Sequence, residues 1–220
     1  MRLRSLAMLT AVIITASGCA GGDDWAAGPH PSPAPIGALG PGFTDPSAPP
    51  TPAGTVTPSP GSWSRVRPSE GYRVVLLTAG PDAPAQAVID AVEEWAGAEH
   101  VDLRTVDAAA HHVDGIVAAI EMRPDLIVSA GNDLIDALAV VTASHLDQQF
   151  LVVGAELPEP TGNVTSVGWT GASFRGTGNG AATVFDPASF TAGRCAAAVR
   201  AGVAAVLHGV TGVVIWMDTF

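Results

Sequence analysis

Between residue 72 and the C-terminus, short apolar runs alternate with segments that repeat apolar residues at helical spacing, and this alternation restricts the fold most. The runs with the length and composition of buried strands are residues 72–79, 101–106, 125–131, 149–155, 163–169 and 211–218. The segments with a helical period are residues 84–98, 110–122, 133–146 and 190–209. Continuous apolar strands separated by helices indicate a parallel sheet that is covered on both faces.

We therefore expect one three-layer, doubly wound α/β domain over residues 69–220. Right-handed crossover connections leave few topologies, of which we predict strand order 2-1-3-4-5 with the last strand at an edge. Asn132 is a candidate N-cap of the third helix, because its amide oxygen can accept a hydrogen bond from the first helical turn. Cys195 lies in a helix of small residues, which favours a packed core thiol over a nucleophile.

The N-terminus has the parts of a secretory signal. Arg2 and Arg4 supply positive charge, residues 6–14 form an apolar run too short to span a membrane, and small residues lead directly to Cys19. Cys19 and the small residues before it resemble the bacterial lipobox, with Ala16 where Leu is usual. This resemblance implies that residues 1–18 are removed as a lipoprotein signal peptide and that Cys19 is acylated. The alternative is a soluble secreted protein with an incidental cysteine.

Residues 19–68 are expected to be the lipidated N-terminus and a linker. Most of the chain's 18 prolines lie there, mixed with Gly, Ser and Thr, and no helical or alternating pattern is present. Proline favours extended conformations, so we predict a disordered but semi-rigid stalk with a reach on the order of 100 Å. Trp63 is the residue that we expect to pack on the edge of the domain.

Composition excludes some classes of partner. The net charge is −11, and all 10 basic residues are Arg. Binding to nucleic acid requires clustered positive charge, so we expect no nucleic-acid partner. The same deficit argues against attachment to anionic lipid through a basic patch. Membrane attachment would therefore depend on the lipid on Cys19.

Three stretches together resemble a known family. They are PDLIVSAGND (124–133), QFLVVGAELPEPTGNVTSVGW (149–169) and RCAAAVRAGVAAVLHGVTGVVIWMD (194–218). They are similar to the basic membrane protein family, lipid-anchored solute-binding proteins of ABC transporters that are related to type 1 periplasmic binding proteins. The resemblance implies a nucleoside-like ligand and an ABC permease as partner. Residues 170–189 leave no room for the second lobe of such receptors, so one lobe is expected.

Candidate ligand-binding residues follow from the predicted topology. Ligands of doubly wound sheets bind beyond the carboxyl ends of the strands, where the strand order reverses. The loops expected at these strand ends contain Gly80, Phe174 and Arg175 as well as the candidates given below. Asn132 and Asp133 have a competing interpretation as helix caps, and Trp169 as a cover for the core. The candidates are Asp82, Asn132, Asp133, Glu156 and Trp169.

Other motifs have simpler interpretations. Gly176–Gly180 (GTGNG) has neither the lysine nor the strand-to-helix context of a phosphate loop, and we expect turns there. His111 and His112 are adjacent on a helix and point about 100° apart, so we predict surface histidines and no metal site. No nucleophile elbow or pair of catalytic carboxylates is recognisable. We therefore expect neither an enzyme nor a cofactor.

Two functions remain in view from the sequence. The first is an extracytoplasmic lipoprotein on the cell membrane that binds a small polar ligand or a partner protein through the strand-end loops. The second is a structural or interaction lipoprotein whose ligand site has decayed and which has no role in transport. A homodimer that restores a two-sided site is a variant of these hypotheses.

Overall fold

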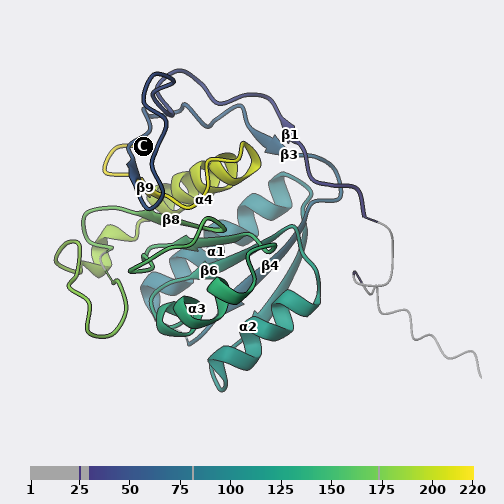
Figure 1. Ribbon diagram of the computed structural model, residues 1–220, viewed down its shortest axis with the longest axis vertical. Coiled ribbons are helices and arrows are strands. Elements are labelled where there is room, and N and C mark those ends of the chain that lie inside the picture. The colour runs from purple at the N-terminus through teal and green to yellow at the C-terminus, as the bar shows by residue number, and fades with distance from the viewer. Residues whose placement is uncertain (1–24, 26–29, 81, 173) are drawn as a thin grey trace, which may run out of the picture.

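The centre of the molecule is a seven-stranded parallel sheet, flanked by helices (Figure 1). The computed structural model describes residue 25 and residues 30–80, 82–172 and 174–220. The strands have the order β2-β9-β8-β7-β6-β4-β5. Their bounds are β2 (Thr55–Val56), β4 (Arg73–Thr78), β5 (Asp102–Asp107), β6 (Leu126–Ala130), β7 (Phe150–Val153), β8 (Val164–Gly168) and β9 (Val214–Trp216).

The two faces of the sheet bury separate cores. α1 (Ala83–Ala98) and α4 (Ala192–Leu207) pack on one face, and α2 (His112–Glu121) and α3 (Ile135–Val141) pack on the other. Strand β4 contributes Val74 and Leu76 to the first core, and Val75 and Leu77 to the second. Successive side chains of a strand point to opposite faces, so a strand that is buried on both sides is apolar throughout.

Local signals set the helix boundaries. The Asp82 carboxylate accepts a hydrogen bond from the Ala85 backbone N–H at 2.6 Å and caps α1. The Thr191 hydroxyl caps α4 in the same way, through the Arg194 N–H at 3.3 Å. Gly209, two residues beyond the end of α4, has a φ of +71°, which favours glycine after a helix. The described residues also form two single-turn 3₁₀ helices, η1 (Thr142–Ser144) and η2 (Pro187–Ser189).

The predicted α/β class is confirmed, and the first five domain strands have the predicted order, since β5-β4-β6-β7-β8 reads 2-1-3-4-5. The predicted edge position of the last strand is wrong. β2 pairs with β9 in parallel register, with Thr55 opposite Val214 and Val56 opposite Ile215. The Val214 N–H donates to the Gly54 carbonyl at 2.9 Å, so β9 is paired with β2 on one side and with β8 on the other.

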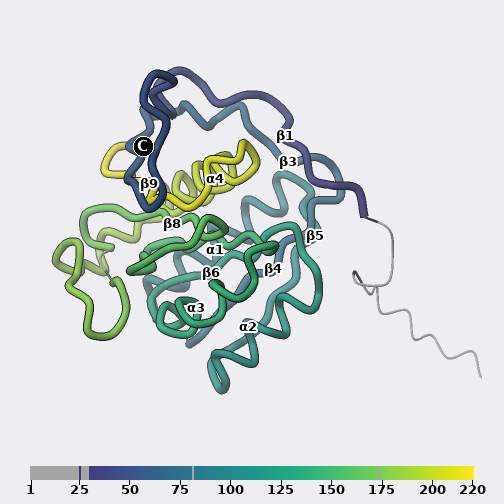
Figure 2. Tube along the Cα trace, in the orientation of Figure 1, coloured from purple at the N-terminus to yellow at the C-terminus, as the bar shows by residue number. Residues whose placement is uncertain are grey.

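Residues 30–68 are not the free stalk that was expected. This segment crosses the outside of α4 and reaches β9 (Figure 2). Phe43 and Trp63 are only 1% and 5% exposed and belong to the same core as α1 and α4, as does Val56. A short antiparallel pair, β1 (Pro35–Ile36) with β3 (Arg67–Pro68), closes the segment on itself. The reason for the difference is burial: these apolar side chains stabilise the packed state more than proline stiffness favours an extended one.

Two further expectations concern particular residues. Trp63 packs on the domain, as predicted, and Cys195 is a fully buried thiol whose pKa is raised to about 11, chiefly by burial. Residues 1–18 and Cys19 lie outside the described residues. Within the described part of the chain, no helix has both the length and the apolar character needed to cross a membrane.

Replacing Phe43 with Ala tests the packing of the N-terminal segment. Truncation of a buried Phe removes apolar contacts and leaves a cavity, so we expect a loss of about 3–5 kcal/mol in the free energy of unfolding. The matched control is Ile36→Ala, because Ile36 is 46% exposed in the same segment and should change stability little. Urea unfolding of both variants gives the measurement. Equal stability of Phe43→Ala and the parent would show that the segment does not belong to the core.

Candidate functional site

A hollow of about 510 Å³ lies at the carboxyl ends of the central strands. Ala79 and Gly80 follow β4, Asn132 and Asp133 follow β6, and His112 begins α2. From β4 the chain passes to β5 on one side and later to β6 on the other, so the strand order reverses at this point. Doubly wound sheets bind ligands in the crevice formed by such a reversal.

Backbone conformation brings the walls of the hollow close together. Gly80 has a φ of +89°, and a Cβ added there would stand 3.3 Å from Oδ2 of Asp133. A side chain at this position would therefore be strained and would crowd the carboxylate. The Asn132 Oδ1 atom is buried and has no hydrogen-bond partner among the described residues. The hollow thus contains polar groups that can accept hydrogen bonds.

The glycine-rich loop (residues 174–180) contributes Phe174 to the lining of the hollow and is tied to α3. Asp136 accepts hydrogen bonds from the Thr177 backbone N–H, at 2.7 Å, and from the Thr177 hydroxyl. These hydrogen bonds hold the pKa of Asp136 below its usual value. Gly176 approaches the same carboxylate, with a φ of +92°. The predicted role of GTGNG as turns therefore agrees with its conformation, and its glycines allow Thr177 to reach Asp136.

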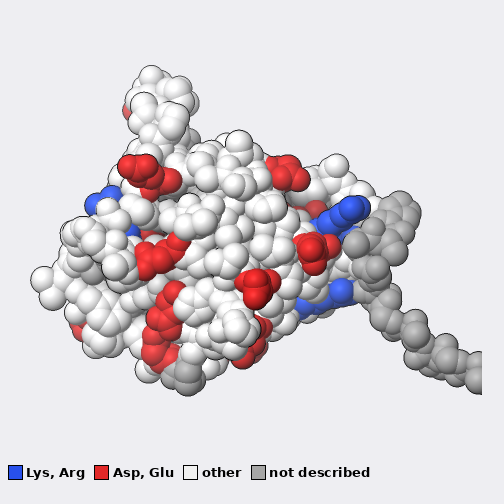
Figure 3. Space-filling model, turned by 60° about the horizontal axis from the view of Figure 1, so that its bottom comes forward, with Lys and Arg blue, Asp and Glu red and all other residues white. Residues whose placement is uncertain are grey.

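The charge around the hollow is negative. Asp133 and Asp136 are exposed at its rim, and Asp133 makes no hydrogen bond or ion pair with the described part of the chain. Acidic side chains are also spread over the side of the molecule seen in Figure 3, with basic side chains toward its edges. Such a field disfavours anions and favours neutral or cationic ligands.

The predicted site residues do not all meet in this hollow. Asn132 and Asp133 line it. Asp82 instead caps α1, and its carboxylate is engaged by Ala85. The predicted N-cap role of Asn132 is wrong, because α3 begins at Ile135 and Leu134 occupies the cap position without a side-chain hydrogen bond.

Glu156 is buried beyond the end of β7, outside the lining of the hollow. Its side chain is 5% exposed, and Oε2 lies 3.4 Å from Nε of Arg175. Oε1 has no hydrogen-bond partner among the described residues and lies near Gly168. Burial raises the pKa of Glu156, and the Arg175 guanidinium opposes this shift. Glu156 and Arg175 thus form an ion pair in which the guanidinium offsets part of the cost of burying the carboxylate.

Trp169 is fully buried and does not face the hollow. Its indole N–H donates to the Ser189 hydroxyl at 2.9 Å, and its ring meets Phe190 edge to face with a centroid distance of 4.9 Å. The structure therefore agrees with the alternative interpretation of Trp169 as a core cover. An aromatic residue just after a strand is compatible with either role, and sequence alone did not distinguish them.

Two ionisable residues of the hollow were not among the candidates from the sequence. His112 was expected only on the surface, and Asp136 was counted as part of a helix. Their position was recoverable in principle, because both lie in the first turn of a helix that follows a strand, and such turns meet at the carboxyl edge of the sheet. Phe174, which was expected in the strand-end loops, does line the hollow.

Two other hollows differ in chemistry. One of about 440 Å³ adjoins the first through Asn132 and Phe174 and is otherwise lined by Ala181, Thr183, Val184 and Phe185. The other, of about 520 Å³, lies within residues 42–57, beside the edge strand β2, and its Asp45 carboxylate accepts hydrogen bonds from Ser47. Among the described residues, no group of three or more His, Cys, Asp or Glu side chains is placed to hold a metal ion.

Comparisons with known proteins give distant similarity of fold. No protein-family model matches the chain, and no curated protein matches it significantly. A solute-binding protein of an ABC transporter system from Aeropyrum pernix K1 is 21% identical over 44% of this chain and 28% of its own, with a TM-score of 0.40. A corresponding protein from Conexibacter woesei DSM 14684 is 17% identical over 44% and 35%, with a TM-score of 0.36.

A third similar structure is a fragment from Peptoclostridium difficile 630 that is proposed to be a lipoprotein. It is 18% identical over 46% of this chain and 85% of the fragment, with a TM-score of 0.41. The chain thus matches about a third or less of the two binding proteins, and most of the fragment. It resembles ABC-transporter solute-binding proteins at low identity over about half of its length.

The pH dependence of stability tests the state of Glu156. A folded pKa above the ordinary value of a glutamate means that folding favours the protonated carboxyl. The stability contributed in this way is complete below that value and is lost as pH rises through the folded pKa. Glu156→Gln should therefore gain stability relative to the parent on going from about pH 4 to about pH 7.

The control for this measurement is Glu159→Gln, an exposed residue of the same segment. Urea unfolding at each pH gives the free energies. A pH-independent difference for Glu156→Gln would mean that the ion pair with Arg175 balances the cost of burial, and a parent that is favoured more strongly at neutral pH would mean that the ion pair outweighs it.

Proposed function

We propose that this chain is an extracytoplasmic lipoprotein, anchored to the cell membrane through Cys19, that binds a small polar ligand at the carboxyl ends of β4 and β6. In this proposal it acts as a one-lobe counterpart of a solute-binding protein. A membrane permease of the ABC class is the partner that the sequence resemblance suggests.

The observation that supports ligand binding most directly is the position of the 510 Å³ hollow. It lies where the strand order reverses, and its lining residues follow four strands, β4, β5, β6 and β8. Its volume falls in the range of small-molecule sites, about 300–1,000 Å³. Asn132 and Asp133 offer oxygen acceptors, and Phe174 offers an apolar surface. A compact, hydroxyl- or amine-bearing ligand that donates hydrogen bonds fits this lining.

A nucleoside remains one member of that ligand class, on the strength of the sequence resemblance. The loop after β4 continues from Asp82 with Ala83, Pro84 and Ala85, and these small residues offer no aromatic ring on which a base could stack. Phe174 is the phenyl ring in the lining of the hollow, which it shares with Asn132. Sugars and amines make no demand for such stacking and fit the acidic rim equally well.

Asp133 provides the most direct test of binding. Because its carboxylate is exposed and unpaired within the described part of the chain, its loss should weaken a ligand without disturbing the fold. We expect one compound from a panel of nucleosides, sugars, amino acids and amines to raise the unfolding midpoint. At a ligand concentration about 100 times Kd, the gain is about 2.7 kcal/mol. Asp133→Ala should reduce this gain strongly.

The control is Asp147→Ala, which removes the same charge from an exposed position just before β7, at the opposite end of the strands. Its ligand response should equal that of the parent. If no compound stabilises the parent, and none is carried through native purification, the small-ligand proposal fails.

Mass spectrometry of the mature protein tests the anchor. In a bacterial host with lipoprotein processing, we expect the parent to lose residues 1–18 and to carry acyl chains on Cys19. Cys19→Ser should leave the protein in the soluble fraction, because more than one acyl chain is what gives stable membrane attachment. A mature parent protein with an unmodified Cys19 would contradict this part of the proposal.

Partner binding is a second candidate, favoured by the neighbouring apolar hollow. Val184 is 87% exposed and Phe185 43% exposed, and both line it together with Phe174. Exposed apolar groups that gather at one place often mark an interface. In this alternative the protein is an interaction lipoprotein, and Val184→Asp should lower the fraction of any dimer seen by light scattering. An entirely monomeric parent that retains no other protein would argue against it.

A further inference from the structure

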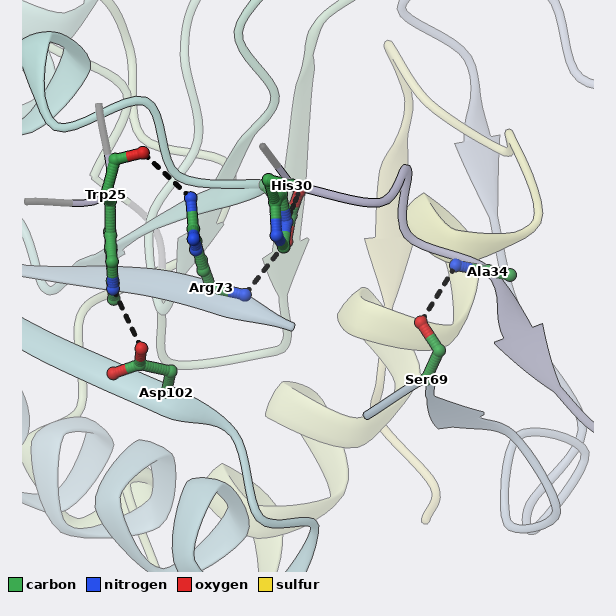
Figure 4. A network of polar contacts seen from close by, with 7 residues as sticks. Trp25, His30, Ala34, Ser69, Arg73 and Asp102 are labelled. Atoms are coloured by element: carbon green, nitrogen blue, oxygen red, sulfur yellow. Dashed lines mark hydrogen bonds and ion pairs between the residues drawn. The ribbon is translucent and has the colours of Figure 1, made fainter. Parts of the chain in front are cut away.

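Trp25 is docked on the domain although it lies only a few residues beyond Cys19 in the sequence. Its side chain is 4% exposed and belongs to the core on the α2 and α3 face. The indole N–H donates to Asp102 at 2.8 Å, and the Trp25 carbonyl accepts from Nη1 of Arg73 at 2.9 Å (Figure 4). The guanidinium of Arg104 lies over the ring, 4.0 Å from its centroid.

A second attachment follows a few residues later. Nε2 of His30 lies 2.7 and 2.9 Å from the two carboxylate oxygens of Asp125, which also accepts the Arg73 backbone N–H at 2.8 Å. Figure 4 shows Trp25 and His30 on either side of Arg73. Beyond them, the Ala34 N–H donates to the Ser69 hydroxyl at 3.2 Å. The start of the described chain is therefore fixed at several points along one side of the domain.

These contacts all gather at the amino ends of the strands. Arg73 begins β4, Asp102 begins β5, and Asp125 directly precedes β6. The candidate ligand hollow lies at the opposite ends, since Ala79 and Gly80 directly follow the last residue of β4. β4 has 6 residues, which at about 3.3 Å each separate the two ends by about 20 Å.

We infer that Trp25 docking fixes the orientation of the domain on the membrane, with the amino ends of the strands toward the bilayer and the ligand hollow away from it. This inference rests on the lipid anchor of the proposed function. Cys19 and Trp25 are joined by six residue steps, which span at most about 20 Å even when fully extended. The point at which the tether leaves the domain is thus set by Trp25.

The consequence is that only a short tether, from Cys19 to Trp25, joins the lipid to one end of the domain. Without the Trp25 contacts, the tether would extend at least to His30, and the domain would reorient more freely relative to the membrane. With them, the membrane approaches the amino ends of β4, β5 and β6, and the hollow opens toward the medium that supplies the ligand. Docking of Trp25 therefore exposes the hollow to ligand in the medium and keeps lipid headgroups away from it.

The experiment measures which end of the domain lies near lipid. The acylated full chain is reconstituted in phosphatidylcholine vesicles, whose zwitterionic surface exerts little force on a protein with a net charge of −11. A fluorophore is placed on Asp147→Cys, at the amino ends, or on Ala181→Cys, beside the hollows. Both positions are exposed, whereas Cys195 is buried and protected from labelling. Nitroxide-bearing lipid then quenches whichever fluorophore lies close to the surface.

We expect quenching to be several-fold stronger at position 147 than at position 181. Trp25→Ala and Asp102→Ala should reduce this difference severalfold, and Asp114→Ala should leave it unchanged, because Asp114 is exposed in the first turn of α2, after the carboxyl end of β5. Because Asp102→Ala retains the indole, it also guards against a folding defect caused by loss of Trp25.

The outcomes separate this inference from the proposed function. Equal quenching at the two positions, or a difference that survives Trp25→Ala, overturns the orientation while leaving the anchor and the hollow intact. A mature protein without acyl chains overturns both the anchor and the orientation. Ligand-induced stabilisation, measured in detergent, reports on the hollow independently of either result.

Discussion

A parallel sheet is stable in water only when both of its faces are covered, and this requirement organises the whole molecule. Helices α1 and α4 cover one face, and α2 and α3 cover part of the other. These four helices leave the β9 edge and the outside of α4 for another segment to cover. Residues 30–68 take that place, with Phe43 and Trp63 in the core and β2 paired to β9. The proline-rich segment is thus part of the folded unit.

Sequence periodicity was sufficient for the elements inside the domain and insufficient for this segment. The apolar strands and the helical repeats are local patterns, and each covers enough residues to be recognised. β2 consists of only Thr55 and Val56, a length at which no alternation can be seen. Proline also dominates the composition of residues 30–68, so the apolar residues between the prolines form no recognisable pattern. Isolated large aromatics such as Phe43 and Trp63 were the available signal, because a free stalk has no reason to contain them.

The candidate site shows the same division. Asn132 and Asp133 line the strand-end hollow, because the topology alone sends the residues after β6 to that edge. Asp82 and Trp169 follow strands equally closely, yet one caps a helix and the other fills the core. Their roles depend on which way a side chain points after the strand ends, and neighbours distant in sequence decide that. Ser189 and Phe190, which bind Trp169, come from the far side of the glycine-rich loop.

That loop also bears on the proposed function, in which a single lobe has to hold a ligand. A single sheet edge covers a ligand from one side only, so an open hollow would exchange its contents with water freely. Thr177 donates two hydrogen bonds to Asp136, and hydrogen bonds to a carboxylate are stronger than neutral ones. The loop is therefore held against α3, with Phe174 in the wall of the hollow. Thr177 occupies acceptor positions on Asp136, whereas Asp133 makes no hydrogen bond within the described part of the chain, so in the proposed function Asp133 is the less engaged of the two rim carboxylates.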